Sequence, residues 1–344
     1  MGECQGCLEG NLSEKLSPKE LEIRRLHGKR SASLSQNIQQ RCKEHTAARF
    51  QRTQAMDLSN CTRVTEFILL AYPRSRALNI TLFVVILLLY FLCVTGNSLI
   101  IVLVCTDHLL QKPMYFFLSN FSVIEMGHTS AFMPKMLVNF LSAKATICFA
   151  CCWIQSFFYY LFGITEFFIL TLISVDRYLA ICQPLRYNTI MTSHACLQLA
   201  LAAWVAGFFS NLSPTLMSLK LPFCGSNIVD HFFCDSGASL KISGGDTHII
   251  EVLGFLTTVA VVLTSLLLTM VSYTFIISTT LRISSSSGRQ KAFSTCVSHL
   301  IVVSILYGAV LFIYLRPTVT DSSSGVVKAV SILNTMVRAE CGGD

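Results

Sequence analysis

Residues 78–104 read LNITLFVVILLLYFLCVTGNSLIIVLV, a stretch without a single charged side chain. About 20 apolar residues are enough for a helix to cross the hydrocarbon core of a bilayer, which is roughly 30 Å thick. Lipid offers no partner for an unpaired backbone amide, and a membrane barrel would need alternating strands of about ten residues. The stretch therefore predicts a transmembrane helix.

Similar runs recur along the chain. Six complete spans are expected, at residues 78–104, 114–141, 147–173, 196–216, 249–277 and 296–315. A seventh run, residues 326–337, meets Arg338 and Glu340 before it reaches the length of a span. The sequence predicts an all-α membrane protein, a seven-transmembrane helix bundle with the seventh helix truncated.

The composition agrees with this class. Hydrophobic residues make up 53% of the 344-residue chain and charged residues 13%, whereas soluble domains carry about 25% charged residues. These proportions argue against a cytosolic enzyme, a fibre and a disordered chain. The lipid bilayer is the expected surroundings of residues 78–337.

The two ends differ in character from the bundle. Residues 1–55 hold ten Lys or Arg and six Glu, which accounts for +4 of the net charge of +7. We expect a disordered extension here, followed by an extracellular amino terminus at residues 56–77. Residues 338–344 form an atypical carboxyl tail. The remaining basic residues mostly lie in short stretches between apolar runs, so no nucleic acid partner is expected.

The loop charges mildly favour an outside amino terminus. The loops after the first, third and fifth spans carry Lys112, Arg177, Arg186, Arg282, Arg289 and Lys291. The opposite loops carry Lys144, Lys220, Lys241 and Arg316. Positive loops tend to stay in the cytoplasm. A channel or transporter is the alternative class, and the lack of internal repeats argues against it.

The third span carries a cysteine near its start and an arginine at its end. Cys152 and Arg177 are separated by about 37 Å of helix, enough to place them at opposite membrane faces. Disulfides persist on the oxidising side of the membrane, where the loop after the fourth span offers Cys224 and Cys234 as partners. A Cys152–Cys234 bridge would pin that loop over the bundle.

Four motifs resemble those of vertebrate odorant receptors, a family of rhodopsin-like G-protein-coupled receptors. They are PMYFFL at 113–118, VDRYLAIC at 175–182, PLRY at 184–187 and KAFSTC at 291–296. The resemblance implies a receptor without enzymatic activity or cofactor, at the plasma membrane, with a glycosylated amino terminus at Asn60. It implies a pocket for a small volatile odorant and an inner face that activates the olfactory stimulatory G protein and raises cyclic AMP.

The resemblance assigns the coupling switch to Asp176, Arg177 and Tyr178. The carboxylate can hold the guanidinium in a resting state until helix movement releases Arg177 toward the G protein. The alternative is an arginine that simply extends from a helix end to the membrane surface.

Two carboxyl groups lie deep within the second and third predicted spans. Glu125 and Glu166 match acidic positions of the family, and charged groups inside a membrane are functional candidates by default. We expect them to share a proton or to hold a sodium ion, with Asn97 as a polar neighbour. The alternative is that each is protonated and bonded to its own helix. No other metal is predicted.

The expected odorant residues lie on the third, fifth and sixth spans. They are Tyr159, Tyr160, Gly163, Ile164, Phe167, Thr257, Thr258, Val261, Tyr307, Val310, Leu311 and Tyr314. Their spacing places the first five on one side of a helix, and their composition suits an apolar ligand oriented by one or two hydroxyl groups. Ordinary helix packing is the alternative for each single residue.

The chain departs from the family at two places. Gly244 stands where the family has a third loop cysteine, so Cys224 is expected to lack its usual partner. After Val337 the family continues with a Pro-x-Leu-Asn-Pro-x-Ile-Tyr segment that this chain lacks. The alternative function is therefore a truncated product that cannot signal and is retained in the endoplasmic reticulum.

Overall fold

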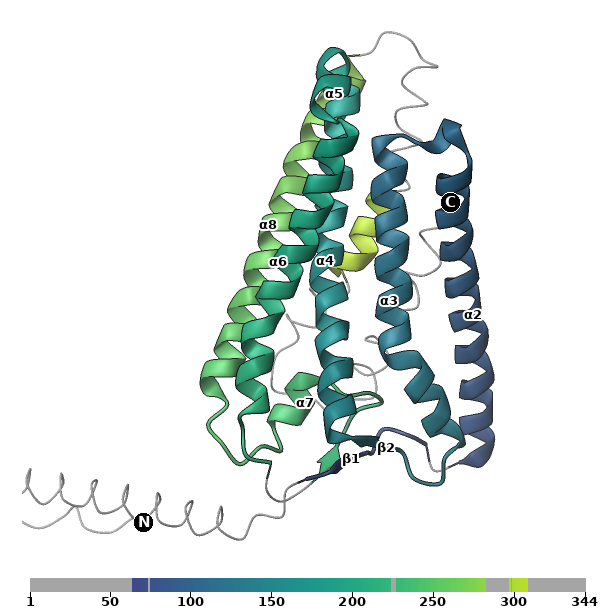
Figure 1. Ribbon diagram of the computed structural model, residues 1–344, viewed down its shortest axis with the longest axis vertical. Coiled ribbons are helices and arrows are strands. Elements are labelled where there is room, and N and C mark those ends of the chain that lie inside the picture. Colours follow the sequence, from purple (N-terminus) through teal and green to yellow (C-terminus); the bar gives the residue numbers. More distant parts are fainter. Residues whose placement is uncertain (1–63, 74, 224–226, 283–296, 298, 309–344) are drawn as a thin grey trace, which may run out of the picture. The chain divides into compact units, whose positions relative to one another are not determined.

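Long helices built from the predicted apolar runs make up most of the structure (Figure 1). The computed structural model describes residues 64–73, 75–223, 227–282, 297 and 299–308. The long helices within these ranges are α2 (Arg76–Thr106), α3 (Pro113–Leu141), α4 (Phe149–Cys182), α6 (Ser193–Leu219) and α8 (His248–Leu281). They correspond to the first five predicted spans.

The sixth predicted span is described in part, as the helix His299–Gly308. The seventh predicted span, the extension at residues 1–55 and the tail at 338–344 lie outside the described residues. Among the described helices, α2, α4, α6 and α8 are long and apolar enough to cross a membrane. α3 has a similar length but buries polar side chains, including those of Ser122, His128 and Thr129.

The helix boundaries differ most from expectation at α4. The helix begins at Phe149 because residues 146–148 belong to a strand, and it continues to Cys182, well past the expected end at residue 173. A charged residue ends the part of a helix that lipid accepts, but Asp176 and Arg177 are compatible with continued helical hydrogen bonding. The inner end of α4 therefore extends beyond the apolar run.

A small sheet, which the sequence analysis did not predict, lies at one end of the bundle. Its strands are β1 (Glu66–Leu69), β2 (Thr146–Cys148) and β3 (Ile228–Val229), in the order β2-β1-β3. β1 runs antiparallel to β2 and parallel to β3. Strands of two to four residues carry too little periodicity to be recognised in a sequence. The sheet connects the segment before α2 to the loop between α3 and α4 and to the loop after α6.

Short helices complete the connections. They are η1 (His108–Leu110), α5 (Pro184–Ile190) and α7 (Ser236–Leu240). Proline occupies the first position of α3 and of α5, where its missing amide hydrogen costs nothing. Thr192 caps α6 by accepting a hydrogen bond from the Ala195 amide.

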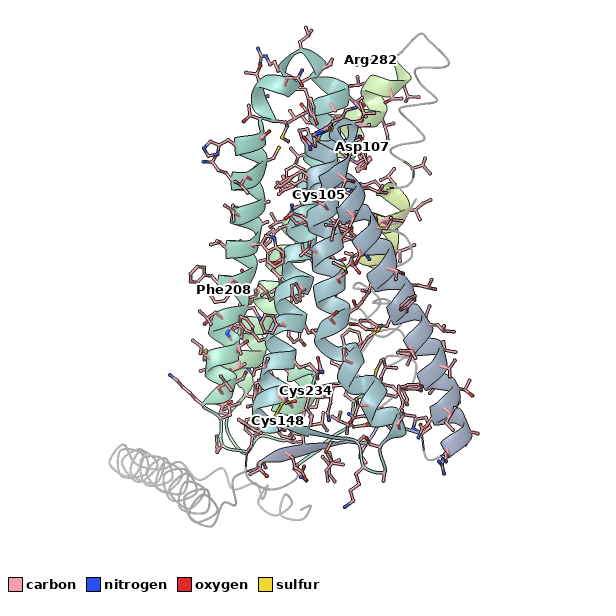
Figure 2. All side chains as sticks on the ribbon, turned by 45° about the vertical axis from the view of Figure 1, so that its right-hand side comes forward. Cys105, Asp107, Cys148, Phe208, Cys234 and Arg282 are labelled. Carbon is pink, nitrogen blue, oxygen red and sulfur yellow. A yellow bond between two sulfur atoms is a disulfide. The ribbon has the colours of Figure 1, made fainter. Side chains whose placement is uncertain are left out.

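α4 is the central helix of the described bundle. It packs against α3, α6 and α8, while α2 packs against α3. Cys148 and Cys234 lie at the opposite end of the bundle from Asp107 and Arg282 (Figure 2). We call the cysteine end the outer end and the Asp107 end the inner end.

Candidate functional site

The outer end of α4 is covalently attached to the loop that follows α6. Cys152 and Cys234 form a disulfide with their Cα atoms 5.2 Å apart. Both side chains are buried. The Gln155 side-chain carbonyl accepts a hydrogen bond of 2.9 Å from the Cys234 amide. Of the two partners that the sequence offered to Cys152, Cys234 is the one bonded here, and Cys224 lies outside the described residues.

A second disulfide joins Cys148 to Cys151, with a Cα–Cα separation of 5.1 Å. Cys148 is the residue before α4, and its sulfur accepts a hydrogen bond from the Cys151 amide. The sequence analysis missed this pair. The C-x-x-C spacing at 148–151 was the available signal, because cysteines three residues apart can meet across one turn of a helix start.

The outer odorant candidates on α4 lie against the same loop. The Tyr160 hydroxyl donates a hydrogen bond of 2.7 Å to the Asp235 carboxylate. The Tyr159 ring packs at 4.9 Å from the Phe233 ring. A Cβ added to Gly163 would have no atom of the described residues within 4 Å. Among the described residues, none fills the space directly beside Gly163.

The deeper candidates form a packed cluster. Phe167, Val261 and Tyr307 are buried in one hydrophobic core, with Ile164 packed against it. The Phe167 and Tyr307 rings are 5.5 Å apart, and the Tyr307 hydroxyl donates a hydrogen bond of 2.7 Å to the Ser265 hydroxyl. This cluster joins α4, α8 and the helix His299–Gly308.

The remaining odorant candidates lie on α8 or outside the described residues. Thr257 and Thr258 are half-buried on α8, and the Thr258 hydroxyl donates a hydrogen bond of 2.9 Å to the Gly254 carbonyl. Val310, Leu311, Tyr314 and the predicted glycosylation residue Asn60 lie outside the described residues. A cavity of 660 Å³ is present between α3 and α4, but none of the predicted odorant residues lines it.

The two intramembrane carboxyl groups are deeply buried. The exposed fraction is 1% for Glu125 and 0% for Glu166. Asn97 on α2 is also buried, and its side-chain amide donates a hydrogen bond of 3.0 Å to the Cys93 carbonyl.

The inner end of α4 carries an ion pair between neighbouring residues. The Arg177 guanidinium donates to the Asp176 carboxylate at 2.8 Å, and Asp176 is fully buried. The Tyr187 hydroxyl on α5 donates to the other oxygen of the same carboxylate, also at 2.8 Å. Burial and the bond to Asp176 raise the pKa of Tyr187 above its usual range, so the hydroxyl stays protonated and donates.

Tyr178 lies beside this pair and links α4 to its surroundings. Its hydroxyl accepts a hydrogen bond of 3.2 Å from the Gln183 side chain, and its ring is 5.8 Å from the Phe275 ring on α8. The role of Tyr187 was missed by the sequence analysis, although Tyr187 ends the PLRY motif. Only the fold of α5 back toward α4 brings Tyr187 to Asp176.

Comparison with known proteins agrees with this geometry. A family profile described as "Olfactory receptor" matches residues 86–337. The chain is 52% identical to human olfactory receptor 6X1 over 280 residues, covering 81% of this chain and 89% of that protein. It is 46% identical to human olfactory receptor 6T1 over 282 residues, covering 82% and 87%. Identity to mouse olfactory receptor 6E1 is 43% over 280 residues, covering 81% and 90%.

Proposed function

The chain belongs to the olfactory receptor family, and from this premise we propose that it binds a small volatile apolar odorant within its helix bundle and activates the olfactory stimulatory G protein. Activation raises cyclic AMP. Members of this family are G-protein-coupled receptors in a membrane and not enzymes. The observation that carries the proposal is the single helix α4, which has a loop-covered outer end and the Asp176–Arg177 pair at its inner end.

The odorant occupies the outer half of the bundle beside Gly163. Support comes from the open space at Gly163, because a side chain there would have no described neighbour within 4 Å. Tyr160 and Asp235 close this space toward the loop, and Phe167 with Tyr307 closes it toward the middle of the membrane. The lining is mainly aromatic and apolar with a few hydroxyl groups, which suits a small volatile molecule.

G-protein coupling uses Arg177. In the resting state Asp176 holds the guanidinium at 2.8 Å, and Tyr187 stabilises the carboxylate from the other side. An inward or outward shift of α8 relative to α4 changes the packing around Tyr178 and Phe275. Such a shift releases Arg177 to accept the G protein as its new partner.

Glu125 and Glu166 provide an intramembrane ion site together with Asn97. A carboxyl group buried to this extent is stable when it is protonated, when it shares a proton or when it faces a cation, and we propose the last of these. Carboxylate and amide oxygens are hard ligands that suit sodium, so the residues fit the ion. A bound sodium ion would supply the positive charge that balances the carboxylates of Glu125 and Glu166.

The receptor acts at the plasma membrane with its amino terminus outside and glycosylated at Asn60. A second candidate rests on residues 338–344, which differ from the segment that the family resemblance implies after Val337. According to this second candidate function, the chain is retained in the endoplasmic reticulum and does not signal. A channel or transporter ranks third, because the chain has no internal repeat.

Flow cytometry of an amino-terminal epitope tag separates the first two candidates. Cells expressing this chain are stained intact and after permeabilisation, beside cells whose chain carries a restored seventh helix. Surface staining of the chain as it stands supports the receptor, and an odorant screen by cyclic AMP then follows. Staining only after permeabilisation, recovered when the helix is restored, supports the retained product.

A further inference from the structure

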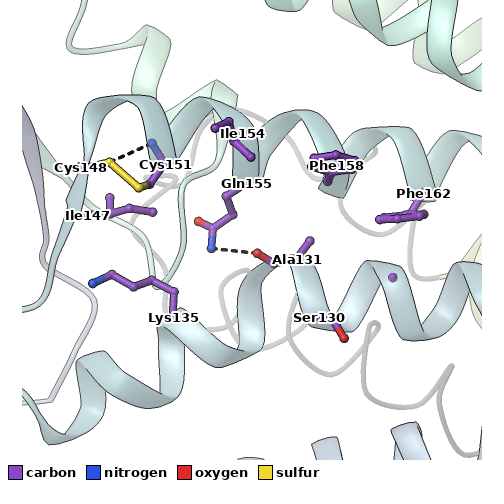
Figure 3. A pocket seen from close by; sticks show the side chains of 11 residues that line it. Ser130, Ala131, Lys135, Ile147, Cys148, Cys151, Ile154, Gln155, Phe158 and Phe162 are labelled. Atoms are coloured by element: carbon purple, nitrogen blue, oxygen red, sulfur yellow. Dashed lines mark hydrogen bonds between the residues drawn. A yellow bond between two sulfur atoms is a disulfide. The ribbon is translucent and has the colours of Figure 1, made fainter.

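The cavity between α3 and α4 has the size of a small-molecule site but lies away from the odorant residues. Its volume of 660 Å³ falls within the range of about 300–1,000 Å³ that ligand pockets occupy. α3 contributes Gly127, Ser130, Ala131 and Lys135 to the lining (Figure 3). β2 and α4 contribute Ile147, Cys148, Cys151, Ile154, Gln155, Phe158 and Phe162. We call it the α3–α4 groove.

The groove opens on the lipid side of the bundle. On α4 its lining recurs every three or four residues, and this spacing defines one face of a helix. The odorant candidates Tyr159 and Gly163 follow Phe158 and Phe162 by one residue, so they point about 100° away. Ile154 is 58% exposed and Phe158 43% exposed. Apolar side chains exposed on a membrane-spanning helix contact lipid.

The floor of the groove is rigid and aromatic. A Cβ on Gly127 would collide with the Phe162 ring, so this glycine allows Phe162 to lie across α3. The Phe158 and Phe162 rings stack at 6.0 Å, and Trp204 on α6 supports Phe162 edge-on at 5.9 Å. Aromatic rings held in this way form a fixed surface along which an alkyl chain can lie.

The outer end of the groove carries a positive charge. Lys135 is half-buried there, and the ion pairs of the described residues do not include it. Its amine extends from α3 toward Ile147 and Cys148 (Figure 3). Gln155 crosses the groove and donates a hydrogen bond of 3.2 Å to the Ala131 carbonyl. An ammonium group beside hydrocarbon gains most from an anionic partner.

We propose that the α3–α4 groove binds a single-chain carboxylate amphiphile, such as a medium-chain fatty acid, that enters from the outer leaflet. Its carboxylate pairs with the Lys135 amine, and its alkyl chain follows Ile154, Phe158 and Phe162. The charges match because one lysine meets one carboxylate. The lining from Lys135 to Gly127 covers about 12 Å along α3, which suits one chain of medium length.

The groove also contacts the outer loop. Gln155 donates to Ala131 within the groove and accepts from the Cys234 amide in the loop that covers the odorant space. An occupant that displaces the Gln155 amide therefore acts on a side chain that positions this loop. The binding proposal stands independently of the odorant and G-protein proposals, because the groove is lined by α3, β2 and the lipid-facing side of α4 and includes none of the residues assigned to those functions.

The test is photolabelling of the purified full chain in neutral phosphatidylcholine nanodiscs. The probe is decanoate with a diazirine at the end of its chain, and mass spectrometry locates the label. Because the carboxylate pairs with Lys135 and the diazirine is at the other end of the chain, we expect label near Gly127 and Phe162 of the wild-type chain. Lys135→Gln should reduce it about tenfold, the loss of one charge-assisted contact. The matched control Lys144→Gln removes an exposed lysine outside the groove and should leave labelling unchanged.

A second pair of variants tests the groove without changing charge. Ile154→Trp fills the groove and should abolish labelling, whereas Leu201→Trp changes a similarly exposed lipid-facing residue on α6 and should not. Labelling is counted only on protein that retains the Cys152–Cys234 disulfide. Equal labelling of wild type and Lys135→Gln overturns the proposal, as does equal labelling by a decanol probe. Complete loss of decanoate labelling in phosphatidylglycerol nanodiscs would assign the groove to a phospholipid and also overturn it.

Discussion

The two ends of α4 are held by different kinds of interaction. At the outer end, the Cys152–Cys234 disulfide and the Gln155 hydrogen bond attach the helix to a loop. At the inner end, Asp176 is held by the Arg177 ion pair and by the Tyr187 hydrogen bond. The outer contacts include a covalent bond, whereas each inner contact can be exchanged for another partner.

This difference suits a receptor that must keep its ligand site while it changes its inner surface. A disulfide on the oxidising side does not open during a signalling cycle. The Asp176–Arg177 pair is largely buried, so Arg177 can leave Asp176 at small net cost only when a new charged partner takes its place. The comparison predicts that outer variants affect folding and ligand affinity, and that inner variants affect signalling.

The largest effect is expected from breaking the outer covalent contact. Cys152→Ser and Cys234→Ser should each abolish surface expression, because losing a loop-closing disulfide costs about 2–5 kcal/mol in small secreted domains. Surface staining of an amino-terminal epitope measures the effect. Cys105→Ser, at an exposed thiol near the inner end, is the control and should stain like wild type. Normal staining of Cys152→Ser would show that the disulfide is dispensable for export.

Removing the inner guanidinium should separate signalling from expression. Arg177→Ala should abolish odorant-evoked cyclic AMP while surface staining stays similar, because Asp176 keeps its hydrogen bond from Tyr187 while the guanidinium proposed to contact the G protein is lost. Arg282→Ala, an exposed arginine at the same end, serves as the control. An unchanged cyclic AMP response in Arg177→Ala would remove this residue from its proposed role.

Loosening the outer loop by one hydrogen bond should weaken odorant binding. Tyr160→Phe removes the bond to Asp235, a loss of about 1.5 kcal/mol for a charged acceptor. The odorant concentration for half-maximal cyclic AMP should rise about tenfold, with little change in the maximum response. The control Tyr90→Phe removes a hydroxyl of α2 that forms a hydrogen bond of 3.0 Å with the Ser130 hydroxyl of α3. This control should not change the odorant concentration for half-maximal response. A lower maximum in Tyr160→Phe would instead indicate a role in activation.

Loosening the inner end by one hydrogen bond should raise basal activity. Tyr187→Phe leaves Asp176 with Arg177 as its described partner and removes the hydrogen bond that fixes the orientation of the carboxylate toward the guanidinium. Basal cyclic AMP should increase about two- to fivefold, which corresponds to about 0.5–1 kcal/mol. A basal level equal to wild type would show that Tyr187 does not contribute to the resting state.

The smallest effect is expected at Cys224. The family resemblance implies that Gly244 stands at the position of the usual partner of Cys224. We therefore expect Cys224→Ser to leave surface staining within about twofold of wild type, unlike the loss of a loop-closing disulfide. Gly244 itself donates a backbone hydrogen bond of 2.9 Å to the Pro222 carbonyl, two residues before Cys224. If Cys224→Ser were as harmful as Cys152→Ser, the assignment of the loop disulfides would be wrong.

The helices and the family could be predicted from the sequence because both depend on local patterns. The run at 78–104 becomes α2 with two extra residues at each end. The motifs at 113–118, 175–182 and 184–187 all lie on helices of the described bundle. An apolar run must satisfy its own backbone in lipid, so its helical state does not depend on distant residues.

Several contacts could not be predicted because they join segments that are far apart in the chain. β1 meets β3 across about 160 residues, as Asn227 donates to the Glu66 carbonyl. Tyr160 finds Asp235, and the groove forms only where Gly127 lets Phe162 lie on α3. None of these pairs has a signal within its own segment.

The sequence alone determined that this chain is an all-α membrane protein of the olfactory receptor family, because helix formation in lipid and short motifs are local properties. The tertiary structure alone decided that Tyr187 supports Asp176 and that Lys135 lies at the end of an apolar groove. Each depends on how α4 packs against its neighbours. Side-chain packing between helices sets such distances, and no single helix contains that information.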